Sequence, residues 1–193
     1  MNAHRLTTSQ TIGPFYSPSL LREDARRNVL VQPDTAGERI RIEGRVLDGD
    51  GLPVTDALVE IWQANAHGRY HHPADNGAAP LDPAFTGFGR SGTDEDGSYW
   101  FETVKPGRVP FDGGGFQAPH IVVTIFARGL LNHAITRLYF GDDPATRDDP
   151  VLRRVPAARR PTLLAARRQS TGQPVYRFDI ILQGEAETVF FDV

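Results

Sequence analysis

The sequence predicts an all-β fold: an antiparallel β-sandwich with an N-terminal arm and long loops. Short stretches in which apolar and polar residues alternate recur along the chain, and this period of two is typical of strands with one buried face. Nineteen glycines and fifteen prolines among 193 residues separate these stretches, which favours many short elements joined by turns. With 39% hydrophobic residues, the chain has enough apolar surface for one packed core.

The first 38 residues lack core periodicity and are predicted to form an arm, followed by a sandwich domain over 39–193. Turn signals at 13–14, 17–18 and 32–34 punctuate the arm, and one short helix is expected over 19–27. Such an arm leaves surface that needs a partner, so we expect it to contribute to contacts with another chain.

About seven strands are expected in the sandwich domain. The clearest alternation, or the richest run of β-branched residues, lies at 40–46, 58–63, 98–104, 120–126, 136–140 and 175–182. Residues 64–92 and 108–118 lack periodicity and are predicted to be long loops, which in a compact domain usually build a site or an interface. Residues 150–168 are expected to hold two short helical segments broken by prolines.

Composition excludes several classes of function. The absence of cysteine rules out disulfides, thiolate metal sites and a cysteine nucleophile. A net charge of −3 gives no footprint for nucleic acid. No apolar run approaches the ~20 residues of a membrane span, and the first ten residues do not resemble a signal peptide. We therefore expect a cytoplasmic chain.

Two residues stand out chemically, and the sequence alone leaves their roles open. His120 opens a strand predicted to be buried, where a histidine is more often hydrogen-bonded to the backbone than bound to a metal. Arg137 lies in an otherwise apolar strand, either as an ion-paired edge residue or as a binding group for an anion. The chain has no glycine-rich phosphate loop and no nucleophile elbow.

Several motifs together resemble the intradiol ring-cleavage dioxygenases, and within that family the iron-free alpha chain of its two-chain members. The resemblance covers essentially the whole chain. It is carried by TSQTIGPFY at 8–16, LVEIWQAN at 58–65, PLDP at 80–83, VKPG at 104–107, APHI at 118–121, TRLYF at 136–140 and QGEAETVF at 183–190.

The resemblance implies oxidative cleavage of a catechol ring by a non-haem Fe(III) held by two tyrosines and two histidines. The four ligand positions fall at Gly77, Val109, His120 and Val122, so only His120 is retained. An arginine that flanks the site in the iron-bearing chains corresponds to Gln117. We therefore expect no catalytic iron in this chain, and expect a homologous beta chain to hold it.

The resemblance also implies where this chain meets the substrate. Its arm, through Thr11, Gly13, Pro14, Phe15 and Tyr16, is expected to line the pocket near the partner's iron, at the interface of an alpha–beta unit that assembles into a larger symmetric oligomer. Arg137 is expected to face the carboxylate of 3,4-dihydroxybenzoate (protocatechuate), which reacts with O2 to give 3-carboxy-cis,cis-muconate in aromatic catabolism.

Two alternatives stay open. The chain is a self-sufficient dioxygenase if substitute ligands such as Tyr70, His71 or His72 join His120. It is a structural sandwich without a pocket role if neither the arm nor Arg137 meets substrate.

Overall fold

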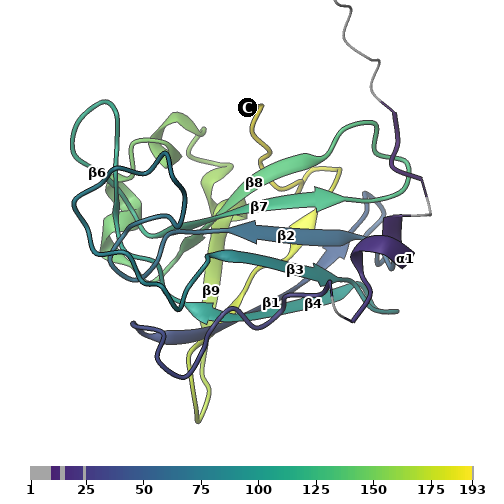
Figure 1. Ribbon diagram of the computed structural model, residues 1–193. Coiled ribbons are helices and arrows are strands. Elements are labelled where there is room, and N and C mark those ends of the chain that lie inside the picture. The colour runs from purple at the N-terminus through teal and green to yellow at the C-terminus, as the bar shows by residue number, and fades with distance from the viewer. Residues whose placement is uncertain (1–9, 14–15, 24, 193) are drawn as a thin grey trace, which may run out of the picture.

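The computed structural model describes residues 10–13, 16–23 and 25–192 and folds them into two packed β-layers (Figure 1). One layer contains, in spatial order, β3 (Phe88–Gly92), β2 (Leu58–Trp62), β7 (His120–Phe126) and β8 (Ala134–Phe140). The other contains β4 (Ser98–Val104), β1 (Arg39–Leu47), β10 (Val175–Arg177) and β11 (Ile180–Ile181). β9 (Leu164–Arg168) pairs with β8 and with β10, so it joins the two layers into one continuous sheet.

Smaller elements cover the ends of the layers. They are α1 (Tyr16–Leu20), the two-stranded ladder of β5 (Val109–Pro110) and β6 (Phe116–Gln117), and three 3-10 turns, η1 (Pro144–Asp148), η2 (Leu152–Arg154) and η3 (Arg160–Leu163). No helix in the described ranges is long and apolar enough to cross a bilayer.

The core lies between the layers, where the alternating apolar residues of the two sheets meet. Ile40 and Ile42 of β1 are fully buried, as are Ile121 and Val123 of β7, and Phe101 of β4 completes the centre. The alternation of apolar and polar residues in the sequence therefore matches the alternation of buried and more exposed residues along these strands.

The prediction of an all-β sandwich is confirmed, and most of its ladders are antiparallel as expected, but the pairing is partly mixed. β1 runs parallel to both β10 and β11, and β8 runs parallel to β9. Parallel neighbours need a crossover connection. The segment with η1, η2 and η3 supplies it between β8 and β9, and most of the chain separates β1 from β10.

Some predicted elements differ in place or type. The helix lies at Tyr16–Leu20 rather than over 19–27, and the end of the segment expected to be helical at 150–168 is strand β9. β3 lies inside the expected loop 64–92 because its glycines hide the alternation. A Cβ on Gly89 would come within 2.8 Å of both Ile61 and Leu30, so the missing side chain makes room for the core.

The later part of the predicted arm packs onto the sandwich. Arg27 forms a β-bridge with Arg90 of β3, and Val29 forms one with Glu102 of β4. Leu30 is buried against the core. Residues 27–30 therefore extend the sheet edges, although they lie within the predicted arm.

Candidate functional site

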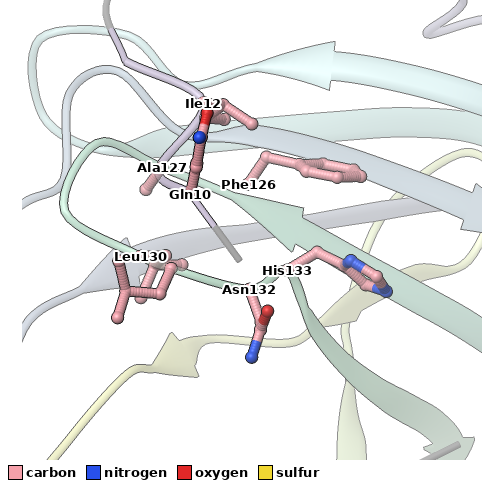
Figure 2. A pocket seen from close by; sticks show the side chains of 8 residues that line it. Gln10, Ile12, Phe126, Ala127, Leu130, Asn132 and His133 are labelled. Carbon is pink, nitrogen blue, oxygen red and sulfur yellow. The ribbon is translucent and has the colours of Figure 1, made fainter. Parts of the chain in front are cut away.

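The described start of the arm lies against the loop that joins β7 to β8. The hydroxyl oxygen of Thr11 accepts hydrogen bonds from the backbone N–H groups of Gly129 (3.2 Å) and Gly13 (3.5 Å). Gly13 has a φ of 66°, a conformation that glycine adopts without strain. Arm and loop enclose a hollow of about 230 Å³ (Figure 2), lined by Gln10, Ile12, Phe126, Ala127, Leu130, Leu131, Asn132 and His133.

Tyr16, the first residue of α1, carries an orphaned hydroxyl beside an ion pair. The hydroxyl is buried and has no hydrogen-bond partner among the described residues. Burial and the charge of Asp56 raise the pKa of Tyr16 to about 12, whereas Arg128 lowers it. Arg128 is paired with Asp56, yet 60% of its side chain is exposed. A buried donor without a partner next to an accessible cation is a polar site that can take a ligand or a neighbouring chain.

The structure thus brings Thr11, Gly13 and Tyr16 to one place, while Pro14 and Phe15 lie outside the described residues. It adds Arg128, which the sequence reasoning missed. The one available signal was its position directly after a buried strand and before a glycine.

Arg137 does not lie with the arm. It is opposite Val122 in the β7–β8 ladder, and its Nη1 donates to the side-chain oxygen of Gln117 (2.7 Å) and to the hydroxyl of Tyr139 (3.4 Å). These partners lie toward the end of the strand pair away from the β7–β8 loop. Three residues of β8, about 10 Å at the usual rise, also separate Arg137 from the strand end nearest that loop.

A buried carboxylate anchors the neighbourhood of Arg137. Asp149, which is 1% exposed, accepts hydrogen bonds from the Tyr139 hydroxyl (3.0 Å) and from the backbone N–H groups of Val151 (2.9 Å), Leu152 (2.8 Å) and Ala118 (2.8 Å). Four donors satisfy this carboxylate, and it ties the segment between η1 and η2 to the start of β7.

Two of the four positions to which the resemblance assigns iron ligands line one cavity. Gly77 and Val109 line a cavity of about 390 Å³ together with Tyr70 and Gln117. His120 and Val122 lie on β7, which begins three residues after Gln117. Two of the four positions thus line one cavity, and the other two lie on the strand that follows Gln117, although Gly77 is distant from the other three in sequence.

The side chains at these positions do not fit a ferric centre. Glycine and valine at three of the four positions carry no donor atom, and Fe(III) is held by several hard donors. His120 is 4% exposed, and its Nδ1 lies 2.8 Å from the carbonyl oxygen of Ala118. Burial and the charge of Arg137 lower the pKa of His120 to about 4, so the ring is neutral near pH 7.

The substitute ligands considered from the sequence do not converge. Tyr70 stacks on Trp62 with ring centroids 5.8 Å apart. The Nδ1 of His71 is 3.2 Å from a backbone carbonyl, and the exposed His72 accepts a backbone hydrogen bond at 3.1 Å. Neither histidine forms, with His120, a cluster of three potential metal-binding residues, and no such cluster of His, Asp or Glu exists in the part of the chain described.

Comparison with known proteins agrees with this architecture. The family model described as "Dioxygenase" matches residues 11–184. The chain is 44% identical to the protocatechuate 3,4-dioxygenase alpha chain of Burkholderia cepacia, with all of both chains covered, and 40% identical to the beta chain from the same organism, with 87% of this chain and 74% of the beta chain covered. Among solved structures, the dioxygenase domain of a carbohydrate-binding fusion protein from Streptomyces sp. SirexAA-E matches with a TM-score of 0.62 and 27% identity, over 92% of this chain and 98% of that domain.

The chain therefore belongs to the intradiol ring-cleavage dioxygenase family, whose members depend on iron. Within the family, its end-to-end similarity is to alpha chains of protocatechuate 3,4-dioxygenase.

Proposed function

We propose that this chain is the alpha-type subunit of an intradiol dioxygenase that acts on protocatechuate and O2. In this proposal the chain holds no catalytic iron, and a homologous beta-type chain holds the Fe(III). The similarity to alpha chains supports the assignment, as does the absence of donor atoms at Gly77, Val109 and Val122. The chain would then act by completing the partner's substrate pocket.

The observation that carries the proposal is the polar site of the arm. The buried, orphaned hydroxyl of Tyr16 lies beside the guanidinium of Arg128, which is paired with Asp56 but largely exposed. The free chain therefore leaves a hydrogen-bond donor without a partner and a cation accessible to a ligand. A flat aromatic ring suits proline and aromatic walls, and its carboxylate suits a guanidinium and N–H or O–H donors. We assign the pocket wall to Thr11, Gly13, Pro14, Phe15 and Tyr16, with Arg128 as its cation.

The same end of the molecule offers apolar surface for a partner chain. Ile12 is 41% exposed and Leu131, in the β7–β8 loop, is 64% exposed. We propose that residues 1–38 serve chiefly as the partner-binding arm, that 39–193 form the sandwich, and that alpha–beta units associate into a symmetric oligomer. Arg137 lies away from this surface, so we assign it a different role below.

Metal analysis tests which of the two chains holds the iron. The chain should be purified alone and after co-expression with a beta-type partner, and iron should be measured in both preparations. We expect stoichiometric iron and protocatechuate cleavage only in the co-expressed complex. A ferric species bound in stoichiometric amount by the isolated chain would refute the proposal in favour of a self-sufficient enzyme.

Steady-state kinetics of the complex test the pocket role. Arg128→Ala should raise KM for protocatechuate by about 10- to 100-fold, the usual effect of losing a charge-assisted hydrogen bond. Arg45→Ala is the matched control, because Arg45 is also exposed and ion-paired, with Asp96, but lies on β1 in the other layer. Equal kinetics for both variants would exclude the arm site from the substrate pocket and favour a structural role.

A further inference from the structure

The guanidinium of Arg137 lies one hydrogen bond away from the cavity lined by Gly77 and Val109. Arg137 makes two described hydrogen bonds, both through Nη1 and both to neutral oxygens, those of Gln117 and Tyr139. Its Nε and Nη2 have no acceptor, and no carboxylate lies within ion-pair distance of it, among the described residues. A guanidinium carries five N–H donors, so most of its binding capacity is unused.

Arg137 is not itself one of the residues that line the cavity, but its guanidinium is hydrogen-bonded to one of them. Gln117, which accepts from Arg137, is one of the cavity's lining residues, and Tyr70 is another. Burial raises the pKa of Tyr70, and the charge of Arg137 opposes that rise. The Tyr70 hydroxyl has no hydrogen-bond partner in the described ranges, and its ring rests on Trp62.

The remaining charges do not neutralise the site. Asp149 is the nearby buried carboxylate, but its oxygens accept four hydrogen bonds and it reaches Arg137 only through Tyr139. Asp75 lines the cavity, and its two oxygens accept the backbone N–H groups of Gly77 (2.8 Å) and Tyr70 (2.7 Å). A ligand anion is therefore expected at the Gln117 end, with uncharged atoms toward Asp75.

We propose that this cavity binds a small aromatic carboxylate, with the carboxylate at Arg137 and Gln117 and the ring against Tyr70, Val109 and Pro110. The fixed guanidinium takes the place of a metal ion as the cation of the site. The pocket is open to solvent, and its volume of about 390 Å³ exceeds the roughly 150 Å³ of a closed cavity that accommodates benzene. Because Gly77 and Val109 offer no metal-binding side chain, we propose only that the cavity binds a ligand.

Intrinsic fluorescence provides a direct test on the full-length chain. The chain has two tryptophans, and Trp100 contacts Arg41 on β1, away from the cavity. In a Trp100→Phe background, Trp62 alone reports on Tyr70. Benzoate should change this signal saturably, whereas benzamide, its neutral counterpart, should bind at least 10-fold more weakly because it lacks the charge that pairs with the guanidinium.

Two variants locate the site. Arg137→Gln should weaken benzoate binding at least 10-fold, and Val109→Phe should fill the cavity and weaken benzoate and benzamide alike. Arg128→Ala, in the arm site, should leave benzoate binding unchanged and so separates this site from the proposed substrate pocket. Thermal unfolding of each variant shows that it is folded.

The proposal is overturned if benzoate gives no saturable signal at millimolar concentration, if Arg137→Gln binds benzoate as the unmodified chain does, or if binding is lost with Arg128→Ala instead. None of these results depends on whether a beta-type partner holds iron. The binding site and the proposed function can therefore fail independently.

Discussion

Replacing Asp149 should cost this chain a large part of its stability. The carboxylate is 1% exposed and accepts one hydroxyl and three backbone N–H hydrogen bonds, at 2.8–3.0 Å. Asp149→Ala removes the acceptor from all four donors, and each buried donor left without a partner costs about 1–3 kcal/mol. Because water enters part of the space, the penalties do not add fully, and we expect the free energy of unfolding to fall by about 3–5 kcal/mol.

Urea unfolding followed by circular dichroism measures this loss. With a slope of about 2 kcal/mol per molar urea, the midpoint should fall by roughly 2 M. Asp149→Asn keeps the shape and one acceptor oxygen, so it should lose less. Asp148→Ala is the matched control, since Asp148 is exposed, and its effect should stay within about 0.5 kcal/mol. If Asp149→Ala were as stable as Asp148→Ala, the carboxylate would not anchor η1 and η2 to β7.

Two further predictions concern His120 and Gly44. Burial, with the charge of Arg137, holds the pKa of His120 at about 4, against 6.5 in the unfolded chain. As the pH falls, the unfolded state therefore takes up a proton before the folded state does. The contribution of His120 to the free energy of unfolding is complete above pH 6.5 and falls by about 3 kcal/mol as the pH drops to 4. Urea unfolding between pH 7 and 4 should show a smaller loss of stability in His120→Gln than in the unmodified chain, whereas the control His67→Gln, at an exposed site, should show the full loss. Equal pH profiles for the two variants would contradict the prediction. Gly44→Ala should prevent folding, because its Cβ would lie 1.7 Å from the carbonyl oxygen of Phe178, whereas Gly172→Ala meets open space and should fold normally; circular dichroism spectra and soluble yield distinguish the two.

The sequence predicted those strands in which burial alternates with the residue pattern. β1, β4 and β7 lie close to their expected bounds because each buries one face against the opposite layer. β3 was not predicted because its glycines leave space for side chains from other segments of the chain, and such packing depends on the tertiary structure. The parallel pairing of β1 with β10 is likewise long-range, since neither strand records its neighbour in its own sequence.

The sequence predicted the site residues that belong to a local motif, but not those that the fold brings together from distant segments. The resemblance pointed to the arm, and the structure groups Thr11 and Tyr16 around one loop. The resemblance pointed to Arg137 as well, and the structure places its hydrogen-bond partner Gln117 toward the other end of the β7–β8 pair. Arg128 could not be predicted as a site residue because it comes next to Tyr16 only when the arm packs against the β7–β8 loop.

The cavity beside Arg137 does not need a metal to keep it open, because backbone contacts hold its walls. Gly68, at one side, has a φ of 82°, and a Cβ there would lie 1.9 Å from the carbonyl oxygen of Arg108, next to Val109. The N–H of Gly107 donates to the carbonyl oxygen of Asn65 at 2.9 Å, which ties the approach to β5 to the start of the long loop. Contacts this close fix the loop against β5 whatever side chains face the interior. Glycine and valine in place of metal-binding side chains therefore remove the metal ligands but leave the cavity open. In our proposal the guanidinium of Arg137 at the edge of this cavity makes it selective for anions.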